Sequence, residues 1–324
     1  MLRIIPERPC FVVNAAAVCH GDVDLNGCGS GLQVSEKVCS GADVSGCTVD
    51  APGMPRMASE PDYKPVITDA NLRRRMGRLL KMSVWCGLRA LEGVAPESVS
   101  GIITSTGAGF MKDTISFGGS LFEREEELLN PSPFMQSTFN TASGYIALMR
   151  KIRSSNTAYV QGAAGFLSAF TDASMLLGEV PGSNVLIGGF DEVTPEVDTV
   201  RRRLGMYRDA SGEFLPLGEG AGFFLLSDSC TSGAKARLYG TAYSSDCAED
   251  FISDCRKISG EELQDVGMVK CSSLAARYGA FSSMLPVIIA DRLCAGVDFG
   301  TVLYVDDVNP DGTMALLGMA GSEN

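Results

Sequence analysis

Short apolar runs of strand length recur along the chain, and segments with helical spacing of apolar residues separate them. The runs lie at 11–18, 101–106, 158–161, 184–190, 222–226, 237–243 and 301–308. Runs that are apolar on both faces are typical of strands buried within a sheet. The alternation predicts an α/β architecture in which helices cover mixed or parallel sheets.

The clearest helical segment begins after Thr68, a residue type suited to cap a helix. One stripe of it carries the apolar side chains, and the arginines at 73, 74, 75 and 78 lie elsewhere. We interpret these arginines as a solvated face rather than an anion site. Further helices are expected at 142–152, 164–177 and 274–293, the last with an irregularity at Pro286.

Residues 19–65 have weak periodicity and are rich in Gly, Ser, Cys, Pro and Asp. We interpret this stretch as a long surface excursion that forms a lid or an interface. Residues 229–235 and 244–265 are expected to be further connections. No repeat of solenoid length is visible, so any duplication is one of fold and not of sequence.

The composition is that of a globular protein, with 45% hydrophobic and 20% charged residues. A formal net charge of −12 opposes nucleic acid or an anionic membrane surface as the main partner. No apolar run reaches the length of a membrane span, so we expect a soluble protein. The eleven cysteines include no C-x-x-C pair. This pattern favours reduced thiols and a cytoplasmic location over zinc binding or disulfides.

The glycine-rich sequence GEGAG at 218–222 lacks the Lys and Ser/Thr of a phosphate-binding P-loop. We therefore expect its small residues to allow close packing of strands.

Four stretches together resemble the β-ketoacyl synthase family. They are PFMQSTFNTASG at 133–144, NTAYVQGAAGFLSAFTDA at 156–173, NVLIGGFDE at 184–192, and the segment 208–226 that contains GEGAG. They resemble, in turn, the helix start before the nucleophile region, the nucleophile elbow and its buried helix, the next strand, and a family signature. The likeness covers most of residues 8–228 and, more faintly, 270–320. It implies a thiolase fold with five layers, α-β-α-β-α, built from two related halves.

The resemblance implies a single thiolase-like domain over 1–324. Its N-terminal half would be 1–205, with the excursion at 19–65, and its C-terminal half, 206–324, would be shortened. The divergent synthase-like branch that accompanies active synthases in polyene and polyketide pathways is the most similar one.

A condensing synthase needs a Cys thiolate at a helix N-terminus and imidazoles that drive decarboxylation. The longest ungapped match places Ala163 at the nucleophile position, and a shift by two residues would place Gln161 there. The only histidine, His20, follows the first predicted strand and is expected to be a surface or structural residue. The chain therefore lacks the condensing set.

The second half departs from the family in the same way. Tyr278 or a neighbour stands where a second catalytic His is expected, and the loop near the active-site mouth becomes DDVNPDGT at 306–313, which contains Asn309. Asp306, Asp307 and Asp311 lack the rest of a calcium-binding EF-hand, so we expect a turn with solvated carboxylates. We expect no metal and no cofactor.

These features predict a non-catalytic subunit, similar to a chain-length factor, that assists an active β-ketoacyl synthase in fatty acid, polyene or polyketide biosynthesis. It would pair through residues 133–170, because a strand at 157–162 would expose an apolar edge. The partner would be the synthase or a second copy of the chain. Phe139 and Asn140 are pocket or interface candidates, and Phe139 would fill an acyl channel, wall a partner's tunnel, or belong to the core.

Two alternative functions remain. One is decarboxylation of a malonyl thioester in a retained oxyanion site that uses Gln161 or backbone N–H groups. The other is a scaffold that binds an acyl group or acyl carrier protein. Because carrier proteins are acidic, the scaffold would need a basic face made from the arginines at 73–78, 150–153 and 201–203.

Overall fold

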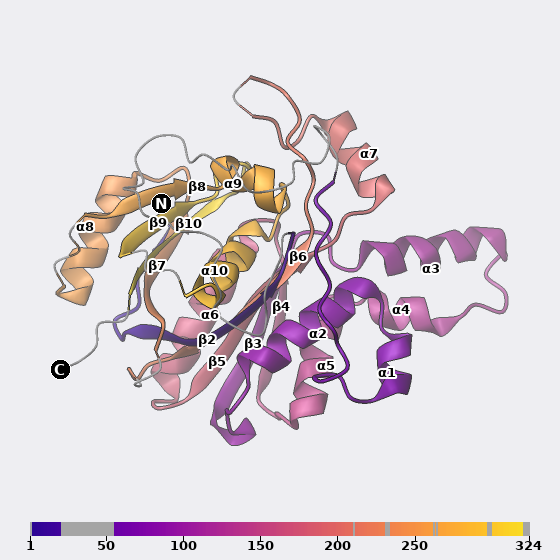
Figure 1. Ribbon diagram of the computed structural model, residues 1–324, viewed down its shortest axis with the longest axis horizontal. Helices are drawn as coiled ribbons and strands as arrows, with labels where there is room; N and C mark the ends of the chain where they lie inside the picture. The colour runs from indigo at the N-terminus through magenta and orange to yellow at the C-terminus, as the bar shows by residue number, and fades with distance from the viewer. Residues whose placement is uncertain are drawn as a thin grey trace.

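A computed structural model describes residues 2–20, 55–209, 211–230, 234–261, 263, 265–296 and 300–319. Its strands form a continuous mixed sheet (Figure 1). The first set is β2 (Cys10–Val18), β3 (Val99–Thr106), β4 (Ser155–Val160), β5 (Asn184–Asp191) and β6 (Gly220–Ser227). Their order in space is β4-β3-β5-β6-β2, with β3, β4 and β5 parallel and β6 antiparallel to both neighbours. Each predicted strand of this set is confirmed to within a few residues.

The second set of strands repeats this order with one strand fewer. It consists of β7 (Ala236–Tyr243), β8 (Gly267–Lys270), β9 (Thr301–Val305) and β10 (Thr313–Met319). Its order is β7-β10-β9-β8, with β8 and β9 parallel and the other pairs antiparallel. Within the described residues, no strand takes the place that β4 holds in the first set. Two related halves with a shortened second half are thereby confirmed. Because β6 completes the first order, we propose that the halves divide after Ser227 and not at 205.

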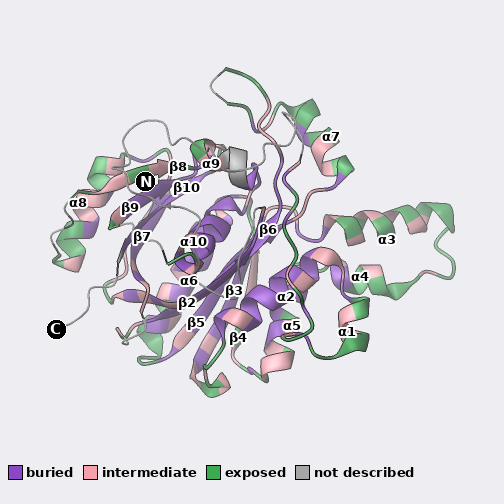
Figure 2. Ribbon diagram, viewed as in Figure 1, coloured by how far each residue is buried: buried purple, intermediate pink, exposed green. Residues whose placement is uncertain are grey.

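Helices form three layers around the two sets of strands. The middle layer is α6 (Gly165–Glu179) and α10 (Met284–Cys294), which pack against strands of the first set and share a core with the second. One outer layer is α2 (Arg78–Ala90) and α5 (Thr141–Arg150), and the other is α8 (Ala248–Ser259) over β7. Figure 2 shows the buried residues concentrated on the strands, α2, α6 and α10. The predicted α-β-α-β-α order is confirmed.

Two predicted helices are each interrupted by a glycine. The first is split into α1 (Ala70–Arg75) and α2, because the backbone is extended at Met76 and Gly77, and Asp69, not Thr68, caps it. The last is split into α9 (Cys271–Tyr278) and α10 at Gly279, whose φ of 73° is left-handed. Pro286 lies in the first turn of α10, where a missing N–H costs little. The irregularity predicted at Pro286 is therefore wrong.

Several elements escaped the sequence-based prediction. They are β1 (Arg3–Ile4), the 3₁₀ turn Pro96–Ser98, α3 (Met111–Glu123), α4 (Pro131–Ser137), α7 (Pro195–Leu204), β8 and β10. The stretch 244–265 is not a connection, because it contains α8. No helix among the described residues is long and apolar enough to cross a membrane.

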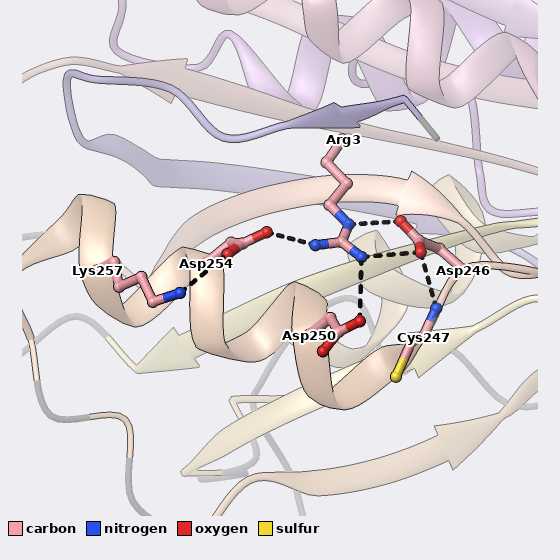
Figure 3. Close-up of polar contacts among 6 residues, drawn as sticks. All are labelled: Arg3, Asp246, Cys247, Asp250, Asp254 and Lys257. Atoms are coloured by element: carbon pink, nitrogen blue, oxygen red, sulfur yellow. Dashed lines mark hydrogen bonds and ion pairs between the residues drawn. The ribbon is translucent and has the colours of Figure 1, made fainter.

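A charged cluster fixes the start of the chain to α8. Arg3, on β1, donates to Asp246 at 2.5 and 2.9 Å and to Asp254, and it lies 3.8 Å from Asp250 (Figure 3). Hydrogen bonds from Arg3 are the main cause that lowers the pKa values of Asp246 and Asp254. The cluster therefore stays charged at neutral pH and holds β1 against the outer helix.

The ends of the predicted excursion meet beside the GEGAG segment. Ser59 N donates to the Cys19 carbonyl at 3.0 Å, and His20 Nδ1 lies 3.0 Å from the Met57 carbonyl oxygen. His20 therefore has a structural contact with the backbone, as predicted. Residues 21–54 lie outside the described part of the chain.

Candidate functional site

Three connections of the chain meet at one place, which we call the loop junction and define as residues 161–164, 279–283 and 306–312. A Cβ on Gly162 would lie 2.7 Å from Asp311 Oδ2, so the turn before α6 touches the β9–β10 connection. Asn309 Nδ2 reaches the Phe281 carbonyl at 3.4 Å and joins that connection to the one between α9 and α10. The junction is thus assembled from both halves of the fold.

The turn after β4 holds the predicted nucleophile positions. Ala163 is 4% exposed and stands two residues before α6 begins, and its methyl group cannot form a thioester. Gln161 is exposed, and its Oε1 accepts from Ser168 Oγ on α6 at 2.6 Å. The Gln161 amide oxygen is thus engaged by α6 and not by the rest of the junction.

Hydroxyl and carboxylate groups gather beside this turn. The Tyr207 hydroxyl lies 3.1 Å from Ser282 Oγ, and a Cβ on Gly107 would meet Ser282 at 2.2 Å. Burial is the main cause that raises the pKa of Tyr207, and the charges of Asp191, Asp306 and Asp311 raise it further. Three carboxylates therefore lie close enough to influence the Tyr207 hydroxyl.

Asp191 ends β5 and binds two loops at once. Its carboxylate accepts from Thr106 Oγ1, the Gly107 and Ala108 amides, and both the amide and the hydroxyl of Ser283, at 2.7–3.1 Å. The side chain is 5% exposed. It fixes the β3–α3 connection against the α9–α10 connection.

Asp306 and Asn309 shape the third connection. Asp306 is 1% exposed and accepts from Asn309 Nδ2 at 2.8 Å and from the Val308 and Asn309 amides. The expectation of a turn with solvated carboxylates is therefore wrong for Asp306, although Asp311 is exposed. Asp307 accepts from the Ser272 amide and hydroxyl at 2.8 and 2.5 Å.

Tyr278 is turned away from this chemistry. It is fully buried, and its hydroxyl donates to Asp291 on α10 at 2.5 Å. A different candidate nucleophile, Cys271, starts α9, but burial raises the pKa of its thiol well above the ordinary value. A buried thiol of this kind is a poor nucleophile.

Burial of Asp306 gives stability a defined pH dependence. Burial raises the pKa of Asp306 to about 6 from its ordinary 3.8, so folding favours the protonated form. The protonated Asp306 therefore contributes to the free energy of unfolding in full below pH 3.8, and this contribution is lost as pH rises through about 6. The difference between the two pKa values corresponds to roughly 3 kcal/mol of stability. We expect the unfolding free energy to decline over this range and Asp306→Asn to flatten the decline.

Urea unfolding of both proteins across this pH range tests the expectation. Burial also raises the pKa of Glu192, to about 7, and this group stays in the variant. A residual decline near pH 7 is therefore expected in both. Identical pH profiles for the two proteins would contradict the assignment to Asp306.

The remaining predicted site residues, Phe139 and Asn140, line a separate pocket of about 540 Å³ beside β4. Thr114, Ser137, Thr138, Phe139, Asn140, Ala158 and Val160 form its wall. Phe139 is 42% exposed, and its ring lies on Gly109, where a Cβ would approach it to 2.5 Å. Val160 directly precedes Gln161, so the pocket adjoins the junction along the chain. Phe139 is thus a pocket residue and not part of the core.

The arginine-bearing helix is only partly a solvated face. Arg74 and Arg75 are exposed, but Arg78 donates to Glu60 at 2.5 Å and to the buried Glu219 of GEGAG. Glu219 also accepts from the Ala58 amide at 2.8 Å. Arg78 therefore has a structural role, because it joins α2 to Glu60 and to the GEGAG segment.

Sequence reasoning missed four residues of this region, namely Tyr207, Asp191, Ser282 and Cys271. Each is a common residue type in an unremarkable local pattern, and their contacts span many residues, as from Asp191 to Ser283. The positive φ of Tyr207, 58°, is visible only in the structure. No sequence signal short of the complete fold identifies them.

Residues 51–204 match the family model of the β-ketoacyl synthase N-terminal domain. No curated protein sequence matches the chain. Among solved structures, the ishigamide ketosynthase/chain length factor is similar, with a TM-score of 0.67 and 16% identity over 97% of this chain and 100% of that one.

Two further structures are similar. The first is the type II polyketide synthase complex AntDE:AntF, an acyl-carrier protein with its ketosynthase bound to the hexaketide, with a TM-score of 0.65, 13% identity, and 97% and 99% coverage. The second is the ketosynthase ApeO with its chain length factor ApeC from Xenorhabdus doucetiae, with a TM-score of 0.54, 16% identity, and 96% and 99% coverage. The chain therefore has the thiolase fold of these structures, and its residues 51–204 are similar to the N-terminal domain of β-ketoacyl synthases.

Proposed function

We propose that the chain is a non-catalytic, chain-length-factor-like subunit that pairs with an active β-ketoacyl synthase in fatty acid, polyene or polyketide biosynthesis. The observation that carries the proposal is the Phe139 pocket at the open edge of the sheet. β4 is hydrogen-bonded to β3 on one side and ends the strand order on the other. An edge of this kind is a place for a partner strand.

The position of the pocket supports a role in shaping the partner's product. Ala158 and Val160 of β4 line it, so a subunit docked at this edge would cover its mouth. A growing acyl chain that reached the interface would meet the ring of Phe139. The size of that side chain would then limit chain length.

The composition of the loop junction opposes independent condensation. A methyl group stands at Ala163, and the polar groups brought there are carboxylates and hydroxyls, not the thiolate and imidazoles that the reaction needs. Two of the similar structures are themselves described as ketosynthase and chain length factor assemblies, which fits a subunit of this kind.

The same electrostatics disfavour the decarboxylase alternative. A malonyl thioester carries a carboxylate, which Asp191, Asp306 and Asp311 would repel at short range. We expect no release of carbon dioxide above background when the chain is incubated with malonyl carrier protein. Release above background would favour decarboxylation.

The other alternative, binding of an acyl carrier protein, is better supported than decarboxylation, and its site would be α7. Arg202 and Arg203 are exposed there, beside Val200 and Leu204, which are 55% and 68% exposed. An acidic carrier protein would find both charge and apolar contact on this face. Arg202→Glu with Arg203→Glu should abolish any such binding, which pull-down with carrier protein would measure.

Co-expression with an intact synthase from the same genome tests the proposed function. We expect a one-to-one complex that makes products of defined length. Phe139→Ala should shift the ratio of longer to shorter products about tenfold, as relief of roughly 1.4 kcal/mol of steric opposition would. Ile258→Ala, an exposed apolar change on the distant α8, is the matched control.

Two results would count against this function. A stable homodimer that binds no synthase would contradict the proposed heterodimer. A complex whose product length is unchanged by Phe139→Ala would contradict the proposed role of the pocket in chain length.

A further inference from the structure

Helices α3 and α4 form an arm, residues 111–137, that extends away from the sheets (Figure 1). None of the residues of α3 is buried, and Gln136 is the only buried one of α4. Helices in proteins owe most of their stability to burial of an apolar face. The arm therefore lacks the cover that helices of its length normally have.

The end of the arm displays apolar side chains in a constrained turn. We call residues 122–128 the arm tip, and all seven are exposed (Figure 2). Phe122 and Leu128 are 88% and 90% exposed. Glu125, Glu126 and Leu128 have left-handed φ values of 48°, 67° and 48°, which side-chain-bearing residues rarely adopt. Strain of this kind clusters at functional positions.

Hydrogen bonds hold the tip in this conformation. Glu126 N donates to the Leu121 carbonyl at 3.1 Å, and Glu127 N donates to the Arg124 carbonyl at 2.8 Å. Arg124 Nη1 also reaches the Leu128 carbonyl at 3.1 Å. Phe122 and Leu128 are thus presented by a formed turn.

The base of the arm is fixed to the body. Gln136 accepts from the Gly77 amide at 2.7 Å and donates to the Arg75 carbonyl, in the break between α1 and α2. Glu192, after β5, accepts from the Lys112 amide at 2.7 Å. The rings of Phe117 and Phe134 lie 5.2 Å apart and join the two helices. Such preorganisation lowers the entropic cost of docking.

Charge decides between possible occupants. The tip carries four glutamates and one arginine, a net charge of −3, on a chain whose net charge is −12. A second copy of the chain would repel the tip, whereas a basic surface would attract it. On the basis of the proposed function, we infer that the arm tip docks into an apolar pocket rimmed by Lys or Arg on the synthase subunit.

The double change Phe122→Ser with Leu128→Ser tests the docking. The probe is the synthase that co-purifies with the wild-type chain, and the measurement is the dissociation constant. We expect it to rise at least about tenfold, as for loss of two interface anchors. Ile258→Ser on α8, 48% exposed, should leave it unchanged. Because the tip residues are exposed, both variants should keep the wild-type melting temperature.

A charge change tests the basic rim separately. Glu125→Lys with Glu126→Lys should slow association and reduce its dependence on salt, with little change in the rate of dissociation. An unchanged association rate would overturn the basic rim.

Failure of the docking can be told apart from failure of the proposed function. If the double serine variant binds the synthase as tightly as wild type does, the arm inference is overturned and the subunit role stands. If the wild-type chain binds no synthase, the proposed function fails and takes the synthase docking with it. Self-association of the wild-type chain that the double variant loses would show a second copy as the occupant and overturn the inference.

Discussion

Gly218→Ala is expected to destabilise the fold by about 3 kcal/mol or more, because a side chain there would strike backbone. A Cβ on Gly218 would lie 1.9 Å from the Tyr278 carbonyl oxygen and 2.8 Å from Gly279 Cα. The Gly218 amide donates to the Ala280 carbonyl at 3.3 Å, and the Ala280 amide donates to the Pro216 carbonyl at 2.7 Å. These hydrogen bonds prevent the two segments from moving apart to make room for a side chain. The close contact at Gly218 is thus with the α9–α10 connection and not, as the sequence predicts for GEGAG, with a strand.

Gly178→Ala is the matched control. Gly178 lies within α6, and a Cβ there would meet nothing within 4 Å. The change should stabilise the protein by up to about 1 kcal/mol, because alanine favours helix over glycine. Urea unfolding of both variants measures the contrast. Equal effects would contradict the backbone contact at Gly218.

All strands except β1, β8 and β10 were predicted, because burial on both faces leaves a continuous apolar run. β5 and β6 are examples, since nearly all of their residues are buried. The helices α3, α4, α7 and α8 were missed because they bury few of their residues or none, and so they lack the buried apolar positions from which the other helices were predicted. The helix breaks at Gly77 and Gly279 depend on tertiary contacts, with Gln136 and Gly218 respectively, that local sequence does not contain.

The candidate site likewise has one part that the sequence could predict and one part that it could not. The presence of a single histidine, His20, follows from composition, and the placement of Ala163 at the nucleophile position is a prediction from one local motif. The contacts of the junction could not be predicted, because Tyr207 meets Ser282 and Gly162 meets Asp311 across the two halves of the fold. Such pairings follow from the repeated strand order, which brings the ends of distant strands together.

Asp191→Ala is expected to destabilise the fold by about 3–5 kcal/mol, because it would leave buried donors on two loops without an acceptor. The Thr106 hydroxyl and the Gly107, Ala108 and Ser283 amides all converge on this carboxylate. Water would replace it poorly at a position that is 5% exposed. The β3–α3 connection, which leads into the arm, and the α9–α10 connection, which belongs to the loop junction, should loosen together.

Asp191→Asn separates the loss of acceptors from the loss of volume. It keeps the shape but turns one oxygen into a donor, which would face the Ser283 amide or the amides of Gly107 and Ala108. Destabilisation between wild type and alanine is therefore expected. Ser283→Ala should cost only about 1 kcal/mol, since the amide bond to Asp191 remains. Urea unfolding gives the ranking, and hydrogen exchange at residues 107, 108 and 283 shows whether the two loops open together. Faster exchange at one loop alone would mean that Asp191 does not couple them.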